Sequence, residues 1–130
     1  LLDYNDLKRI GDLRELVENH DAKFVMIDHH RQPSDFADIM ISNPEKSSTS
    51  EMIFDTIRDL GDMEVINKPI GECLYTGILT DTGSFRFGST KKATHLAAAH
   101  LLDVGVEPDY VYTKVYDNNT LNRIHLMGYT

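Results

Sequence analysis

The sequence predicts an α/β fold of three layers, in which helices cover both faces of a mostly parallel sheet. Strand, helix and strand follow one another within the first 28 residues, the order of a βαβ unit. The crossover of such a unit is right-handed and makes its two strands parallel. The strand segments are unbroken apolar runs, which is typical of strands buried on both faces. We find no internal repeat and no internal domain boundary in the sequence.

The first third of the chain supplies the predicted strands. Apolar residues at helical spacing over residues 6–19 predict a helix between the first two strands, and Asn5 or Asp6 can cap it. Its apolar face consists of Leu7, Ile10, Leu13, Leu16 and Val17. The strands are expected at residues 1–4, 23–28 and 35–42.

Helices are predicted for most of the remaining chain. The capping-box pattern Ser48 to Glu51 begins a helix that ends at Gly61. Pro69 indicates the start of the next helix, because proline suits the first helical turn. A short extended piece is expected at 84–87. The later helices are expected at residues 68–81, 90–104, 108–117 and 120–129.

Charge and composition exclude some classes of function. The 130 residues include 13 Lys and Arg against 21 Asp and Glu, a net charge of −8. An acidic surface of this kind argues against binding to duplex DNA. The single cysteine, Cys73, fits a reducing, cytoplasmic location. No apolar run approaches the ~18 residues that span a bilayer, so no membrane association is expected.

Acidic and imidazole side chains follow two of the predicted strands. Asp3 ends the first strand, and Asp28, His29 and His30 end the second. Ligand sites in open parallel sheets lie at the carboxyl ends of the strands, so these groups are expected to lie together. A further candidate is Asp81, which follows a helix.

This combination of residues suits a pair of divalent metal ions. Two metals about 3.5–4 Å apart activate water and stabilise charge on a phosphoryl group. Mixed carboxylate and imidazole ligands favour Mn²⁺, with Mg²⁺, Fe²⁺, Co²⁺ or Zn²⁺ as alternatives. The alternative for Asp3 is a helix cap or a solvated turn, and for His29 and His30 the residue pattern leaves metal binding and other roles open.

Four segments resemble the DHH phosphoesterases in order and spacing. Val25 to His30 is similar to the family's Asp-His-His motif. Leu1 to Asp3 resembles the family's second motif, an Asp that ends a strand. The segment from Asn43 to Glu51 resembles the loop and helix that follow, and Gly77 to Phe85 resembles the fourth motif. The likeness is strongest to bacterial oligoribonucleases and adenosine 3′,5′-bisphosphate (pAp) phosphatases, often labelled exopolyphosphatase-related.

The resemblance implies a role for each residue of the cluster. Asp3 and Asp81 would bridge two Mn²⁺ ions, and His29 would ligate one of them. His30 would contact the substrate phosphate or complete the metal shell. Asp28 would orient an imidazole by a hydrogen bond, so that His30 and Asp28 form the expected catalytic pair.

Three further residues are candidates for substrate contact. Ser48 and Thr49 stand at the start of a predicted helix, where anions are favoured, with simple N-capping as the alternative. Arg86 follows the Asp81 loop, and its alternative is an ordinary surface arginine.

The resemblance also bears on domain organisation. The family's first motif and its Gly-Gly-rich second domain have no counterpart in the sequence. Residues 1–130 therefore resemble the back part of a DHH domain, running into an interdomain linker at about 120–130. The fragment alone is expected to be inactive or nearly so.

The expected function is that of an Mn²⁺-dependent phosphoesterase acting on small nucleotides, namely pAp or short single-stranded oligoribonucleotides. An exopolyphosphatase, a pyrophosphatase or a cyclic-dinucleotide phosphodiesterase would use the same site. A non-catalytic nucleotide-binding module is the alternative of another class. The apolar helices also permit a homodimer.

Overall fold

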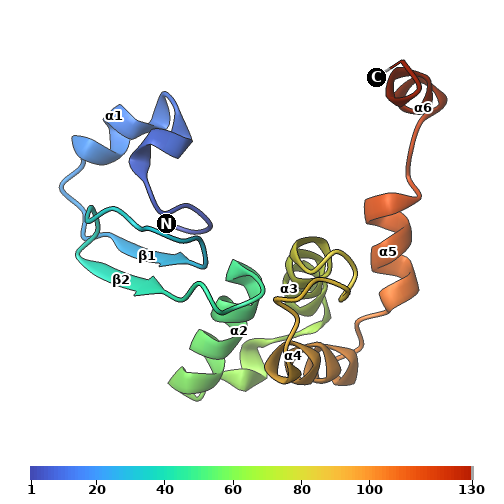
Figure 1. The fold of residues 1–130 in the computed structure, drawn as a ribbon. Coiled ribbons are helices and arrows are strands. Elements are labelled where there is room, and N and C mark those ends of the chain that lie inside the picture. Colours follow the sequence, from blue (N-terminus) through green and yellow to red (C-terminus); the bar gives the residue numbers. More distant parts are fainter. Residues whose placement is uncertain (130) are drawn as a thin grey trace.

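The computed structural model describes residues 1–129 and confirms an α/β fold (Figure 1). Figure 1 shows α1 (Leu13–Glu18) above the strands as drawn and α2 (Thr49–Leu60) below them. The remaining helices follow in chain order and extend away from the strands. These are α3 (Lys68–Asp81), α4 (Lys92–Asp103), α5 (Pro108–Tyr116) and α6 (Leu121–Met127).

The sheet consists of two parallel strands, β1 (Val25–Asp28) and β2 (Ile39–Ser42), as the sequence predicts. Val25 pairs with Ile39, and Asp28 pairs with Ser42. The predicted strand at residues 1–4 is reduced to one parallel bridge between Leu2 and Ile27. β1 thus lies between β2 and the start of the chain, and this arrangement delivers Asp3 beside the end of β1.

The helix predicted for residues 6–19 is divided in two. A 3₁₀ turn (Leu7–Ile10) precedes α1, and Gly11 between them has a φ of 54°, outside the helical region. Leu13 and Leu16 on the expected apolar face are 59% and 68% exposed. The periodicity correctly indicated helical backbone, but these two side chains are not buried against the rest of residues 1–129.

The helical part of the chain contains the hydrophobic core. Ser48 caps α2 and Asn67 caps α3, while Gly61 ends α2 with a left-handed φ of 79°. These ends agree with the capping pattern in the sequence. A second 3₁₀ turn (Met63–Val65) connects α2 and α3. The core cluster joins α2, α3, α4 and α5 through Phe54, Ile66, Leu74, Tyr75, Ile78, Leu79, Ala97, Ala98, Leu101, Val106 and Val111.

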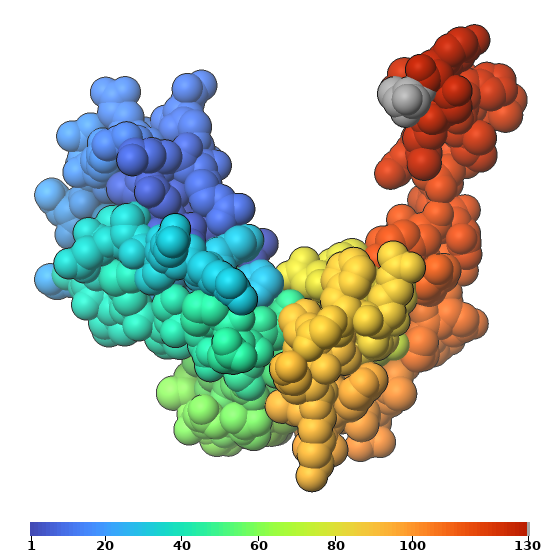
Figure 2. All heavy atoms as spheres, viewed as in Figure 1, coloured from blue at the N-terminus to red at the C-terminus, as the bar shows by residue number. Residues whose placement is uncertain are grey.

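The loop after α3 differs from expectation, and the last two helices extend away from the rest of the helical part. Residues 84–87 form turns and not an extended piece, because Ser84 and Phe85 both have left-handed φ values, 62° and 64°. Beyond this loop, α5 and α6 project from the helical part, as the space-filling view in Figure 2 shows. Within the described residues, no helix has the length and apolarity needed to cross a bilayer.

Candidate metal centre

Asp3 is positioned by the bridge at the start of the chain. Its backbone N–H donates to the carbonyl of Ile27 at 3.1 Å, and its φ of 63° lies in the left-handed region. Its carboxylate Oδ1 accepts a hydrogen bond of 2.8 Å from Thr49 Oγ1 at the first turn of α2. Asp3 is therefore held by two different elements, while its side chain stays more than half exposed.

His30 is oriented by the aspartate that ends β1. Asp28 is completely buried, and its Oδ1 lies 2.8 Å from His30 Nδ1. Its Oδ2 accepts a hydrogen bond of 2.7 Å from the His30 backbone N–H. Because a carboxylate only accepts hydrogen bonds, Nδ1 donates, and the lone pair of the imidazole is on Nε2. The guanidinium of Arg9 lies 3.5 Å from that atom.

His29 is oriented through its Nδ1 atom, as His30 is, but by a backbone carbonyl. Its Nδ1 lies 3.4 Å from the carbonyl oxygen of Lys46, which can only accept, so Nε2 again has the lone pair. This Nε2 lies 3.7 Å from Asp3 Oδ1 and 3.5 Å from Asp81 Oδ2. A metal ion bound at Nε2 would offset the repulsion between this lone pair and the two carboxylates.

Asp81 lies at the last position of α3, and its carboxylate approaches the same His29 nitrogen as that of Asp3. The pKa of its carboxyl is raised, because burial and the nearby charge of Asp3 outweigh the lowering by His29 and His30. Two carboxylates that approach one imidazole are typical of sites where charges are gathered for function. A bound cation would relieve the repulsion between Asp3 and Asp81.

The four side chains form one cluster that fits a divalent metal. Ligand atoms of Asp3, His29 and His30 all lie within 4.8 Å of one another. Asp81 joins this group through its 3.5 Å approach to His29. Carboxylate oxygen and imidazole nitrogen are donors suited to Mn²⁺ and related ions. The structure thus brings together the four residues for which the sequence analysis expected metal contacts.

The remaining candidates are placed differently. Ser48 is completely buried, and its hydroxyl oxygen accepts from the Glu51 N–H at 3.0 Å, so it caps α2 and presents nothing to a substrate. Thr49 is also buried and donates to Asp3. Arg86 is exposed, and its guanidinium lies 5.4 Å from the centre of the Phe87 ring, so its contact is with this ring and not with the cluster.

Sequence reasoning missed the network behind this cluster. The buried carboxylate of Glu51 accepts hydrogen bonds from Ser47 Oγ at 2.5 Å and from Thr94 Oγ1 at 2.9 Å. The Lys46 ammonium also bonds to Glu51 and forms an ion pair with Asp55. Glu51 thereby holds the segment whose Lys46 carbonyl contacts His29. The capping-box pattern singled out Glu51, but only as a helix cap.

The pKa of Glu51 reflects this network. Burial by itself would raise it, but the hydrogen bonds from Ser47, Thr94 and Lys46 outweigh burial, so that the pKa lies below its usual value. The carboxylate is therefore ionised at neutral pH, and it stabilises the turn that precedes α2.

Comparison with known proteins agrees with the resemblance seen in the sequence. The family model described as DHH family, N-terminal domain, matches residues 1–78. A bifunctional oligoribonuclease and PAP phosphatase NrnA from Thermus thermophilus is 40% identical over 83 residues, which are 64% of this chain and 25% of that protein. A cyclic-di-AMP phosphodiesterase PdeA from Listeria monocytogenes is 31% identical over 97 residues, which are 72% of this chain and 14% of that protein.

A solved structure agrees over nearly the whole chain. The crystal structure of an exopolyphosphatase-related protein from Bacteroides fragilis superposes with a TM-score of 0.93 at 43% identity. The match covers 98% of this chain and 38% of that protein, so this chain spans only part of the proteins that it resembles. The family match covers more than half of the chain and includes Asp3, His29 and His30. The chain belongs to the DHH family.

Proposed function

We propose that this chain provides ligands for the divalent metal centre of a phosphoesterase, with Mn²⁺ as the preferred ion. The observation that carries the proposal is the cluster of Asp3, His29 and His30 ligand atoms within 4.8 Å, with Asp81 beside His29. Both imidazoles present Nε2 as the acceptor, because their Nδ1 atoms are bonded to Lys46 and Asp28. A pair of such ions polarises a phosphoryl oxygen and supplies a nucleophilic water at neutral pH.

The protein's own residues have separate tasks in this proposal. Asp3 and Asp81 each supply a carboxylate oxygen near His29 Nε2. Thr49 holds the Asp3 carboxylate in place, and Asp28 holds the His30 ring. His30 is about one third exposed, so its Nε2 can contact a metal ion through its lone pair, whereas contact with a substrate phosphate would require a proton on that atom.

The proposed substrates are small nucleotide phosphoesters, namely short oligoribonucleotides and pAp. The names of the similar proteins support this class, since the Thermus protein is named for oligoribonuclease and PAP phosphatase activity. The net charge of −8 disfavours long duplexes, whose binding depends on many cationic contacts. Because the chain spans about a quarter of that protein, we propose that turnover requires segments equivalent to the rest of its length.

A second candidate is hydrolysis of a cyclic dinucleotide at the same metal centre. The similarity to the Listeria cyclic-di-AMP phosphodiesterase favours it. The reaction class, hydrolysis of a phosphoester, is the same for both candidates. The two candidates are separated by substrate preference.

The test is a panel of substrates with Mn²⁺, namely pAp, a short oligoribonucleotide, pyrophosphate, polyphosphate and cyclic di-AMP. Product release is measured for the full protein and for the Asp81→Asn variant, and Mn²⁺ binding is measured by calorimetry. We expect Mn²⁺-dependent turnover that the variant loses. Mn²⁺ binding without turnover of any substrate would instead support a nucleotide-binding module, and turnover that is unaffected in Asp81→Asn would refute the proposed centre.

A further inference from the structure

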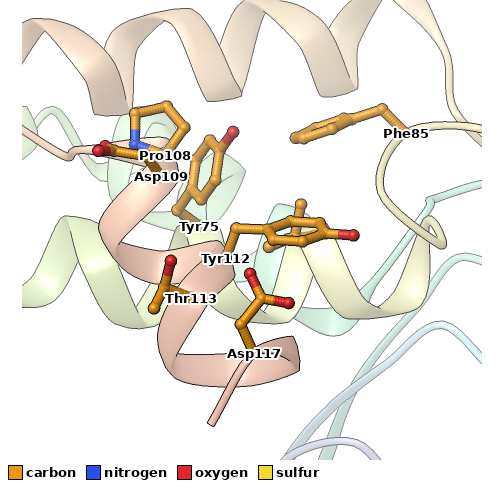
Figure 3. Close-up of a pocket in the computed structure, with 8 residues that line it drawn as sticks. Tyr75, Phe85, Pro108, Asp109, Tyr112, Thr113 and Asp117 are labelled. Carbon is orange, nitrogen blue, oxygen red and sulfur yellow. The ribbon is translucent and has the colours of Figure 1, made fainter.

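A pocket lined by aromatic side chains lies between α3, α5 and the loop at residues 82–88 (Figure 3). Its volume is about 440 Å³, within the range of pockets that hold small molecules. We call it the aromatic pocket. Its walls include Tyr75, Leu79, Phe85, Asp109, Tyr112 and Asp117.

The two rings that face the space are held by packing. Figure 3 shows Phe85 on the loop side of the pocket and Tyr112 on the α5 side. Phe85 packs against Tyr75 and His95 at centroid distances of 5.7 and 5.6 Å, and Tyr112 packs against Tyr116 at 4.8 Å. Because Phe85 stacks one face on His95, a planar ring that enters the pocket would meet the other face of Phe85 and the ring of Tyr112. Bases stack on such faces with little regard to their identity.

The charges around the pocket indicate which part of a nucleotide enters it. The lining residues that carry charge at neutral pH are Asp109 and Asp117, both acidic. Carboxylates repel a phosphate but accept hydrogen bonds from the N–H groups of a base. An adjoining hollow of about 260 Å³ shares Tyr112 and is lined by Ser84 and Arg86, a cation. These charges favour a nucleotide whose base lies in the aromatic pocket and whose phosphate lies near Arg86.

The loop that forms one wall of the pocket follows directly after Asp81 of the candidate metal centre. Leu79 precedes Asp81 by two residues, and Ser84 follows it by three. Gly83, Ser84 and Phe85 all have left-handed φ values, 56°, 62° and 64°. For the two non-glycine residues this conformation is costly, and such strain gathers at functional sites. The turn places Phe85 and Arg86 immediately beyond the metal-binding aspartate.

We infer that the aromatic pocket binds a nucleobase of the substrate, with the ring between Phe85 and Tyr112 and the adjacent phosphate directed to Arg86. The inference rests on the proposed function for the identity of the ligand. It assigns to Tyr112, on α5, a part in substrate binding that is separate from metal binding. Binding without turnover is sufficient to test it.

The experiment compares adenosine 5′-monophosphate with ribose 5-phosphate, which lacks the base, by calorimetry on the full chain. Stacking on an aromatic side chain contributes enough that we expect the nucleotide to bind about tenfold more tightly. Tyr112→Ala should bring the two affinities together, whereas Tyr112→Phe should preserve the difference. The matched control is Tyr110→Ala on the same helix, since Tyr110 is 49% exposed, Tyr112 is 42% exposed, and only Tyr112 lines the pocket.

Equal affinity for the two ligands in the unmodified protein, or binding of neither, would overturn the inference. The same conclusion would follow if Tyr110→Ala removed the difference as fully as Tyr112→Ala does. Failure of the proposed function is seen separately, as product release that does not depend on Mn²⁺ and Asp81. The two failures are therefore distinguishable.

Discussion

Thr49 donates a hydrogen bond of 2.8 Å to the carboxylate of Asp3, across 46 residues of sequence. The donor stands in the first turn of α2, and the acceptor follows the single bridge to β1. The contact joins the strand region to the helical part of the chain at the candidate metal centre. The oxygen that accepts this bond, Oδ1, is also the one that lies 3.7 Å from His29 Nε2.

Removal of this hydrogen bond should weaken metal binding. Partners that orient a metal ligand typically affect affinity by about 10- to 100-fold, and we expect a loss in this range for Thr49→Val. Mn²⁺ titration by calorimetry measures it. The matched control is Thr56→Val, on the same helix, where the hydroxyl bonds only to the Met52 carbonyl. If both variants bind Mn²⁺ as the unmodified protein does, Thr49 does not orient Asp3 for metal binding.

A second prediction concerns Asp28 and the tautomer of His30. In Asp28→Asn, the side-chain amide can donate to Nδ1, which moves the imidazole proton to Nε2 and blocks that atom as a ligand. We expect Mn²⁺ affinity to fall by about 10- to 100-fold with the fold preserved. Asp38→Asn, which changes an exposed carboxylate paired with Lys23, serves as the control. Unchanged affinity in Asp28→Asn would show that His30 is not a metal ligand.

The buried carboxylate of Glu51 should make stability depend on pH. Its pKa is lowered in the folded protein, so ionised Glu51 stabilises the fold above its usual value of 4.5. This contribution is lost as the pH falls from 4.5 through the lowered pKa. We therefore expect Glu51→Gln to be less stable than the unmodified protein at pH 7, with a difference that narrows below pH 4.5. Urea unfolding at several pH values measures this difference.

The control for Glu51 is Glu64→Gln, because Glu64 is exposed. Its stability should follow that of the unmodified protein at every pH. A stability difference for Glu51→Gln that stays constant from pH 7 to pH 3 would mean that the lowered pKa makes no contribution.

Close packing of α2 on α3 yields a prediction that is independent of function. A Cβ added to Gly77 would lie 1.9 Å from Ser50 Oγ and 2.8 Å from Ser50 Cβ. Because the helices must separate to admit it, we expect Gly77→Ala to lower the free energy of unfolding by about 1–3 kcal/mol or more. Gly88→Ala, whose added Cβ would meet nothing within 4 Å, should change it little. Equal stability of the two variants in thermal unfolding would contradict the packing seen here.

Several features of the fold follow from the local sequence. Ser48 and Gly61 predict the ends of α2, and Pro69 predicts the start of α3, because each acts on backbone groups within one helical turn. The parallel pairing of β1 with β2 agrees with the expected parallel sheet, but burial on both faces does not hold, since Ile39 and Ile41 of β2 are exposed. Local preferences did not predict features that depend on how the elements pack together. They did not show that Leu13 and Leu16 would remain exposed, or that Ser84 and Phe85 would adopt left-handed turns.

The α/β class, the family resemblance and the candidate set Asp3, His29, His30 and Asp81 could all be read from the sequence, since these residues follow elements that local patterns identify. How those side chains are held follows from the packing of the fold. Thr49 bonds to Asp3, and Thr94 bonds to Glu51 across 43 residues, because separate elements pack together. Helical periodicity and capping act within a few residues. Contacts over such separations depend on the packed fold, and no local pattern contains them.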